Sequence, residues 1–244
     1  MSNLANTYAD QRKWNEAEQL YSQVLNISKK ILGDKHLDTL IYMRELARIY
    51  ADQEKWNEAE QLQVQVLYMS KKVLGAEHPI TLTCMSNLAR TYANQGCFKD
   101  AEQLDVQVLD MSKKLLGAED PDTLISMVNL ASTYSSQEKW NEAEKLLVQA
   151  LDTSKKVLGA EHLTTFICMS NLASTYSSQG RWNEAEKLQV QVFDMSKKLL
   201  GAEHSKTFIS MSNLVSTYLI QEKWNEVEKL LSEENDLLEA LDLL

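Results

Sequence analysis

The side chains that could bind or react recur in columns, at a fixed step of 42 residues along the chain. One of these columns is asparagine, and it stands beside the apolar positions instead of among them. Its members are Asn3, Asn87, Asn129, Asn171 and Asn213. Asparagine is a poor residue for a helix interior, because its side chain competes for backbone hydrogen bonds. The column therefore indicates a role other than helix formation, unless repeat duplication simply copied a neutral surface residue.

Three arginines, Arg44, Arg48 and Arg90, stand close to this column in the second and third repeats. Guanidinium groups pair with carboxylates in bidentate geometry, so we expect an acidic segment of a partner to bind near them. The alternative is that these arginines form ion pairs with acidic residues of the chain itself. The candidates for such pairs are Glu45, Asp52 and Glu54.

A histidine column lies in a predicted turn, and its members are His36, His78, His162 and His204, with Asp120 as the fifth. One histidine per repeat cannot converge on a metal ion, and aspartate replaces histidine more readily as a helix cap than as a ligand. We therefore expect capping residues here, and neither a metal nor another cofactor. No nucleophile, base and orienting acid recur as a set, and the sequence has no glycine-rich phosphate loop. An enzyme is not expected.

Ten lysines recur in Ser-Lys-Lys stretches, which could form a basic track or could complement helix dipoles in the last turn of a helix. The formal net charge of -10 argues against nucleic acid or an anionic membrane as the partner, because both need a basic surface. No apolar run is long enough to cross a membrane, and the first residues do not resemble a signal peptide. We expect a cytoplasmic protein whose three cysteines are reduced.

The apolar spacing predicts two helices in each repeat. In the third repeat they span residues 81–95 and, starting at 98 or 99, residues up to 116. A polar residue before proline, as in His78-Pro79 and Asp120-Pro121, predicts the start of the first helix, and Gly117 predicts the end of the second. The stretch from Asn57 to Glu60 is either a capping box or an acidic first turn.

The whole chain, residues 1–244, is expected to be one repeat domain. Its repeats start near residues 1, 43, 85, 127, 169 and 211. We expect the first helix to be clipped, since the opening residues of the other repeats are missing before Met1. Residues 232–244 could restart an amphipathic helix that caps the array, and the alternative is a frayed acidic tail.

The run Asn-Leu-Ala-x-x-Tyr-x-x-Gln-Gly-x-Trp-x-Glu-Ala-Glu-x-Leu at 171–188 resembles a tetratricopeptide repeat. The step of 42 residues resembles the longer variant of kinesin light chains and of the repeat arms of fungal NB-ARC or NACHT-type ATPases. The resemblance implies an all-α, right-handed solenoid of stacked antiparallel helix pairs. It also implies that the first helices line a concave groove, where the asparagine column would bond the backbone of a bound peptide.

Two functions follow as hypotheses from this resemblance. The first is a non-catalytic scaffold that binds an extended, acidic peptide in the groove. The second is a self-associating arm of a larger STAND-type signalling ATPase. For any association we expect a homodimer through the amino-terminal end, because Met1, Leu4 and Tyr8 lie on a helix with one uncovered side. Acidic residues, namely Glu228, Glu233, Glu234 and Glu239, are expected to screen the other end.

Overall fold

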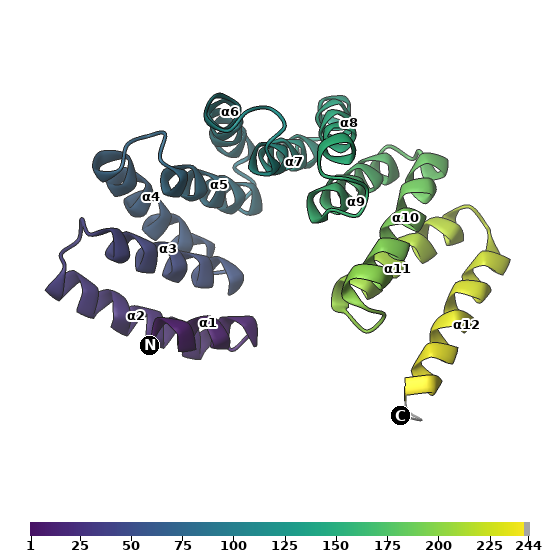
Figure 1. Ribbon diagram of the computed structural model, residues 1–244, viewed down its shortest axis with the longest axis horizontal. Helices are drawn as coiled ribbons and strands as arrows, with labels where there is room; N and C mark the ends of the chain where they lie inside the picture. The colour runs from purple at the N-terminus through teal and green to yellow at the C-terminus, as the bar shows by residue number, and fades with distance from the viewer. Residues whose placement is uncertain (242–244) are drawn as a thin grey trace. The chain divides into compact units, whose positions relative to one another are not determined.

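The computed structural model describes residues 1–241, and it describes side chains through residue 232. Within residues 1–241 the regular structure is entirely α-helical, and the helices are connected by short turns (Figure 1). The chain divides into two compact units, Met1–Ala118 and Glu119–Leu244. The all-α fold that the sequence predicts is confirmed by these helices.

The first unit contains three helix pairs in which each helix packs against the next one along the chain. The pairs are α1 (Ser2–Asp10) with α2 (Trp14–Ile31), α3 (Leu37–Asp52) with α4 (Trp56–Val73), and α5 (Pro79–Asn94) with α6 (Phe98–Leu115). The second unit contains three more pairs of the same design. These are α7 (Pro121–Ser136) with α8 (Trp140–Val157), α9 (Leu163–Ser178) with α10 (Trp182–Leu200), and α11 (Ser205–Ile220) with α12 (Trp224–Leu241).

Caps in the turns determine where the first helix of a repeat begins. His78 Nδ1 accepts a hydrogen bond from the Ile80 backbone N–H at 3.2 Å, and Asp120 Oδ1 accepts one from Asp122 N–H at 2.9 Å. His36, His162 and His204 act in the same way. The capping role predicted for the histidine column is confirmed, because the side chain satisfies a donor that the first turn leaves free.

The second helices of the first five repeats begin without a side-chain cap. Trp56 is the first residue of α4, and Lys55 occupies the N-cap position with no side-chain hydrogen bond to the helix. Asn57 is therefore already helical, and Glu58 lies in the first turn. Of the two alternatives for this stretch, the acidic first turn is the one that the structure shows, and the helix dipole favours it.

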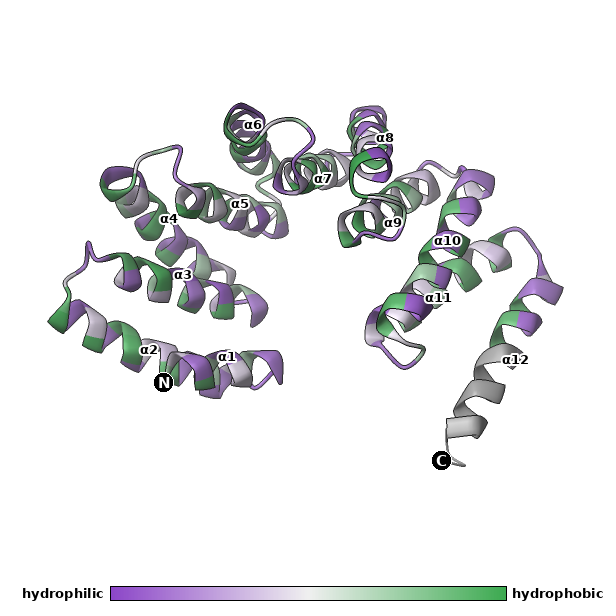
Figure 2. Ribbon diagram, in the orientation of Figure 1, coloured by the Kyte–Doolittle hydropathy of each residue, from purple (hydrophilic) through white to green (hydrophobic). Residues whose placement is uncertain are grey.

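The core is formed by columns of small and flexible apolar side chains. Met43, Met85, Met127 and Met169 are buried, and so is the alanine of the second helix in each of the first five repeats. The alanine lets two helices approach closely, and methionine fills the irregular space that remains. The tryptophans that open the second helices lie at its margin, since Trp140 is half-buried and Trp224 is 59% exposed. Figure 2 shows hydrophobic and hydrophilic residues on the same helices, as amphipathic helices require.

Consecutive repeats within a unit are connected by a polar contact that we call the repeat joint: a glutamate of one repeat's second helix with a glutamine and a cation in the next repeat's turn. In the second unit Glu144 accepts hydrogen bonds from Gln179 Nε2 at 3.1 Å and from Arg181 Nη1 at 2.8 Å. In the first unit Glu18 accepts bonds from Gln53 and Lys55. The Arg181 guanidinium also stacks on the Tyr176 ring, 4.2 Å from its centroid. Where both bonds form, the joint holds the turn of one repeat on the previous repeat of the same unit.

None of the helices that the structure describes is long and apolar enough to cross a membrane. The cap predicted over residues 232–244 and the acidic screen at Glu233, Glu234 and Glu239 concern side chains outside the described residues, so both stay predictions.

Candidate interaction surface

The asparagine column lies on the first helix of five repeats: α1, α5, α7, α9 and α11. Asn3, Asn129 and Asn213 are exposed, whereas Asn87 and Asn171 are half-buried. Asn171 Nδ2 donates to the Ile167 carbonyl of its own helix at 2.9 Å. Asn171 therefore has one of its two amide N–H donors in use, and its second N–H and its carbonyl oxygen are the groups that it can offer to a partner.

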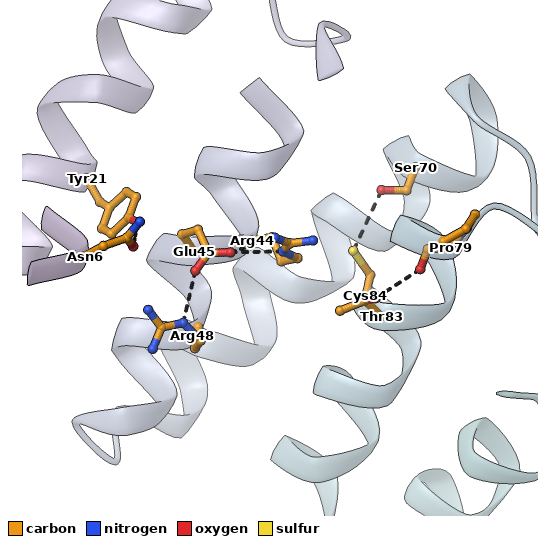
Figure 3. A network of polar contacts seen from close by, with 9 residues as sticks. All are labelled: Asn6, Tyr21, Arg44, Glu45, Arg48, Ser70, Pro79, Thr83 and Cys84. Atoms are coloured by element: carbon orange, nitrogen blue, oxygen red, sulfur yellow. Dashed lines mark hydrogen bonds and ion pairs between the residues drawn. The ribbon is translucent and has the colours of Figure 1, made fainter. Parts of the chain in front are cut away.

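In α3 the column is occupied by Glu45, which lies between two arginines (Figure 3). Arg44 donates to Glu45 Oε1 from Nε at 3.2 Å and from Nη2 at 2.7 Å. Arg48 donates from Nε to Glu45 Oε2 at 3.0 Å, and from Nη1 to Asp52 Oδ2 at 3.0 Å. Both arginines thus make the ion pairs that were the alternative to partner binding, and Glu54 does not take part in these contacts.

The charge of this cluster is balanced, because two guanidinium groups face the carboxylates of Glu45 and Asp52. Burial alone would raise the pKa of Glu45, but the hydrogen bonds from Arg44 and Arg48 outweigh it and lower that pKa. Nearby, the Tyr21 hydroxyl donates to Asn6 Oδ1. Arg90 differs from the other two arginines, since it is exposed on α5 and is the only charged residue of that helix.

The second unit contains a pocket of about 290 Å³ between α9, α10 and α11. Its walls are apolar where Phe166, Trp182, Ile209 and Ile220 line it. Asn213 of the asparagine column also lines the pocket. So do Ser174 and Ser216, which occupy equivalent positions in consecutive repeats. The structure therefore brings one predicted binding residue to a concave, partly apolar site. Lys206 is the single charged residue among the described lining residues.

Gln189 of α10 is a lining residue that the sequence did not indicate. Its side chain is only 6% exposed, and its Oε1 atom is buried without a hydrogen-bond partner among the described residues. The only sequence signal is a polar residue on the apolar face of the second helix, where the previous repeat has Leu147. Among the residues that the structure describes, no cluster of three His, Cys, Asp or Glu could hold a metal ion.

The family model described as "Tetratricopeptide repeat" matches five overlapping stretches of the chain: residues 1–67, 42–114, 90–156, 122–198 and 166–240. A search of the curated proteins gives no match to the chain. No catalytic family is indicated by the matches to the family model.

Two crystal structures of a Podosopora anserina protein, described as a putative kinesin light chain with nearly identical TPR-like repeats, are similar to this chain. One of them, a form with a single substitution, is 33% identical, covers 82% of this chain and 94% of its own, and has a TM-score of 0.71. The other structure is 34% identical, with 81% and 93% covered and a TM-score of 0.69.

Two more distant structures share the fold alone. BtubC (BKLC) from P. vanneervenii is 16% identical, with 95% of this chain and 92% of that chain covered and a TM-score of 0.73. A STAND protein with a tetratricopeptide repeat sensor from Pyrococcus horikoshii is 13% identical, with 99% and 35% covered and a TM-score of 0.71. The repeated helix pairs, the family matches and the identity above 30% agree, and the chain belongs to the tetratricopeptide repeat family as an all-α repeat solenoid.

Proposed function

We propose that this chain is a non-catalytic scaffold that binds an extended peptide of a partner protein along the first helices of its repeats. The observation that carries the proposal is the pocket between α9, α10 and α11, where Asn213 and two serines lie beside exposed Ile209 and Ile220. Asparagine and serine can bond a peptide backbone, and the apolar walls can receive one of its side chains. Repeat proteins use such surfaces to bind extended partners.

The preference for an acidic peptide is supported at fewer positions than the sequence indicates. Arg44 and Arg48 already pair with carboxylates of the chain, so a ligand would have to compete with Glu45. Arg90 and Lys206 are exposed and are the positions at which we propose that peptide carboxylates bind. A ligand with only one or two acidic residues fits this arrangement better than a densely acidic one.

The test is a double variant of exposed members of the asparagine column, Asn129→Ala with Asn213→Ala. A peptide is first selected by display on the unmodified protein, and its affinity is measured by fluorescence anisotropy. Each lost hydrogen bond contributes about 1 kcal/mol, so the double variant should bind more than tenfold more weakly.

The matched control is Asn26→Ala with Asn141→Ala, two exposed asparagines of second helices. This pair should leave the affinity unchanged. If the two double variants bind the selected peptide equally well, the asparagine column does not form the site.

Self-association, as in an arm of a STAND-type ATPase, is the second candidate, and the exposure of α1 favours it. Met1 is 61% and Leu4 48% exposed, whereas the leucines equivalent to Leu4 in the later repeats are buried. Sedimentation at increasing concentration tests this candidate, with Leu4→Ser as the variant expected to reduce any dimer. A dimer that Leu4→Ser leaves unchanged would place the contact elsewhere.

A further inference from the structure

The pocket of the second unit presents several hydrogen-bond acceptors to a ligand, beside the donors of Asn213 and Lys206. Ser170 donates its hydroxyl proton to the Phe166 carbonyl at 2.9 Å, Ser177 to Ala173 at 3.0 Å and Ser216 to Ser212 at 2.8 Å. A serine hydroxyl has one proton to donate and two lone pairs to accept with. Since each proton is bound within its own helix, these serines present acceptors to the pocket.

Gln189 adds an acceptor that the protein itself leaves unused. Its Nε2 donates to Ser177 Oγ at 3.3 Å, which is consistent because the Ser177 proton is engaged with Ala173. This contact orients the amide, so that Oε1 is the atom buried without a partner. A buried acceptor without a donor is unfavourable, and a ligand that supplies the donor removes that cost.

The charge and the shape of the pocket further restrict which kinds of ligand it can bind. Of the described residues that line the pocket, none is Asp or Glu, and Lys206 opposes a second cation. Phe166, Trp182 and Ile209 favour an apolar body, and about 290 Å³ is enough for a group of one ring.

We propose that this pocket binds an uncharged group with an apolar body and an N–H or O–H donor, which it pairs with Gln189 Oε1. This inference rests on the proposed function, in which the group is a side chain of the bound peptide. The pocket then selects among peptides by the presence of a donor, in addition to the backbone contacts of the asparagine column.

Three small probes of nearly the same shape separate these properties. Benzamide carries an amide donor, acetophenone has a methyl group in place of that donor, and benzamidinium carries donors with a positive charge. Binding is measured on the full chain by NMR titration, following the amides of Asn213 and Ser170. We expect benzamide to bind about tenfold more tightly than acetophenone, which corresponds to one net hydrogen bond, and benzamidinium to bind more weakly than benzamide.

The variant Gln189→Leu should abolish the difference between benzamide and acetophenone, and Leu147 shows that the repeat accepts leucine at this position. The matched control is Gln63→Leu, because Gln63 has the same buried, unpartnered Oε1 but does not line the pocket. Gln63→Leu should preserve the preference for benzamide.

The proposal is refuted if no probe binds, if benzamide and acetophenone bind alike, or if the preference survives Gln189→Leu. A selected peptide that still requires Asn129 and Asn213 in that case would leave the proposed function standing. If the Asn129→Ala with Asn213→Ala variant binds the selected peptide as tightly as the unmodified protein, and the preference for benzamide is intact, the proposed peptide surface alone is refuted.

Discussion

Replacing Gln63 by leucine should stabilise the protein, because it removes a buried polar atom that has no hydrogen-bond partner among the described residues. Gln63 lies in α4, is only 4% exposed and has an Oε1 atom with no partner among the described residues. The residue in the same column two repeats later is Leu147, which is 1% exposed. Another repeat therefore already buries leucine at the equivalent position.

The magnitude follows from the acceptor that is removed. An unsatisfied buried acceptor costs roughly 1–3 kcal/mol, and leucine avoids that cost while filling a similar volume with apolar atoms. We expect the free energy of unfolding to rise by about 1–3 kcal/mol, which corresponds to roughly 2–12 °C in Tm for a chain of this length.

The assay is guanidinium denaturation followed by circular dichroism, with calorimetry as the second measurement. The reciprocal variant Leu147→Gln introduces a buried amide, whose oxygen we expect to lack a donor as Gln63 Oε1 does, and it should destabilise the protein by a similar amount. If Gln63→Leu is no more stable than the parent, the acceptor is satisfied by a buried water, and the reasoning applied to Gln189 loses its basis.

Three further predictions concern the turns, the acidic range and the margin of the core. Gly180 has φ +72°, so Gly180→Ala should lower the stability by roughly 1 kcal/mol or more. Glu138 stands in the same column at φ +58°, and Glu138→Gly should not lower the stability. Equal losses of stability for the two variants in guanidinium denaturation would contradict the strain argument. Burial tends to raise the pKa of Glu144, but hydrogen bonds from Arg181 and Gln179 lower it overall. A lowered folded pKa means that the contribution of Glu144 is present above the unfolded pKa and is lost as pH falls through the folded value. Glu144→Gln should therefore flatten the loss of stability measured below about pH 4.5, and an unchanged profile would refute this assignment. Trp140→Ala should cost about 3 kcal/mol or less, because Trp140 is only half-buried, and a melt identical to the parent's would show that it contributes nothing.

The helices could be predicted because the sequence repeats its own pattern, so that every ambiguous position is compared with five others. The expected start at His78-Pro79 and the expected end near Gly117 agree with α5 and α6 as the structure has them. His78 and Asp120 share a column only because both can accept a bond from the backbone, which is a local property. The exposure of the tryptophans was harder to predict, for the opposite reason. Apolar spacing locates Trp224 on the inner face of a helix, but exposure depends on what the next element covers.

The candidate site was less accessible to sequence reasoning, since it depends on partners that are not adjacent in sequence. The two alternatives for Arg44 and Arg48 differ only in side-chain conformation, and the structure is what reveals the pairing with Glu45. In the sequence Gln189 is only a polar residue on the apolar face of a helix. The structure shows that it lines a pocket and that its Oε1 atom has no partner among the described residues. The role of the asparagine column stays a prediction, because its test requires a ligand.

The repeat joint has a consequence for how such a chain can change in length. Glu18 and Glu144 occupy the same column, and so do Lys55 and Arg181, so the same residue types connect neighbouring repeats in both units. Deleting or inserting a whole unit of 42 residues rejoins a glutamate with a glutamine and, in most units, with a cation. Cys97 replaces the cation in the third repeat, and there Glu60 accepts the hydrogen bond from Gln95 without a cation at the equivalent position. Recombination between copies of the repeat can therefore lengthen or shorten the binding surface without the need for a new interface. Wherever the third repeat is placed, its joint with the previous repeat lacks the cation and is weaker.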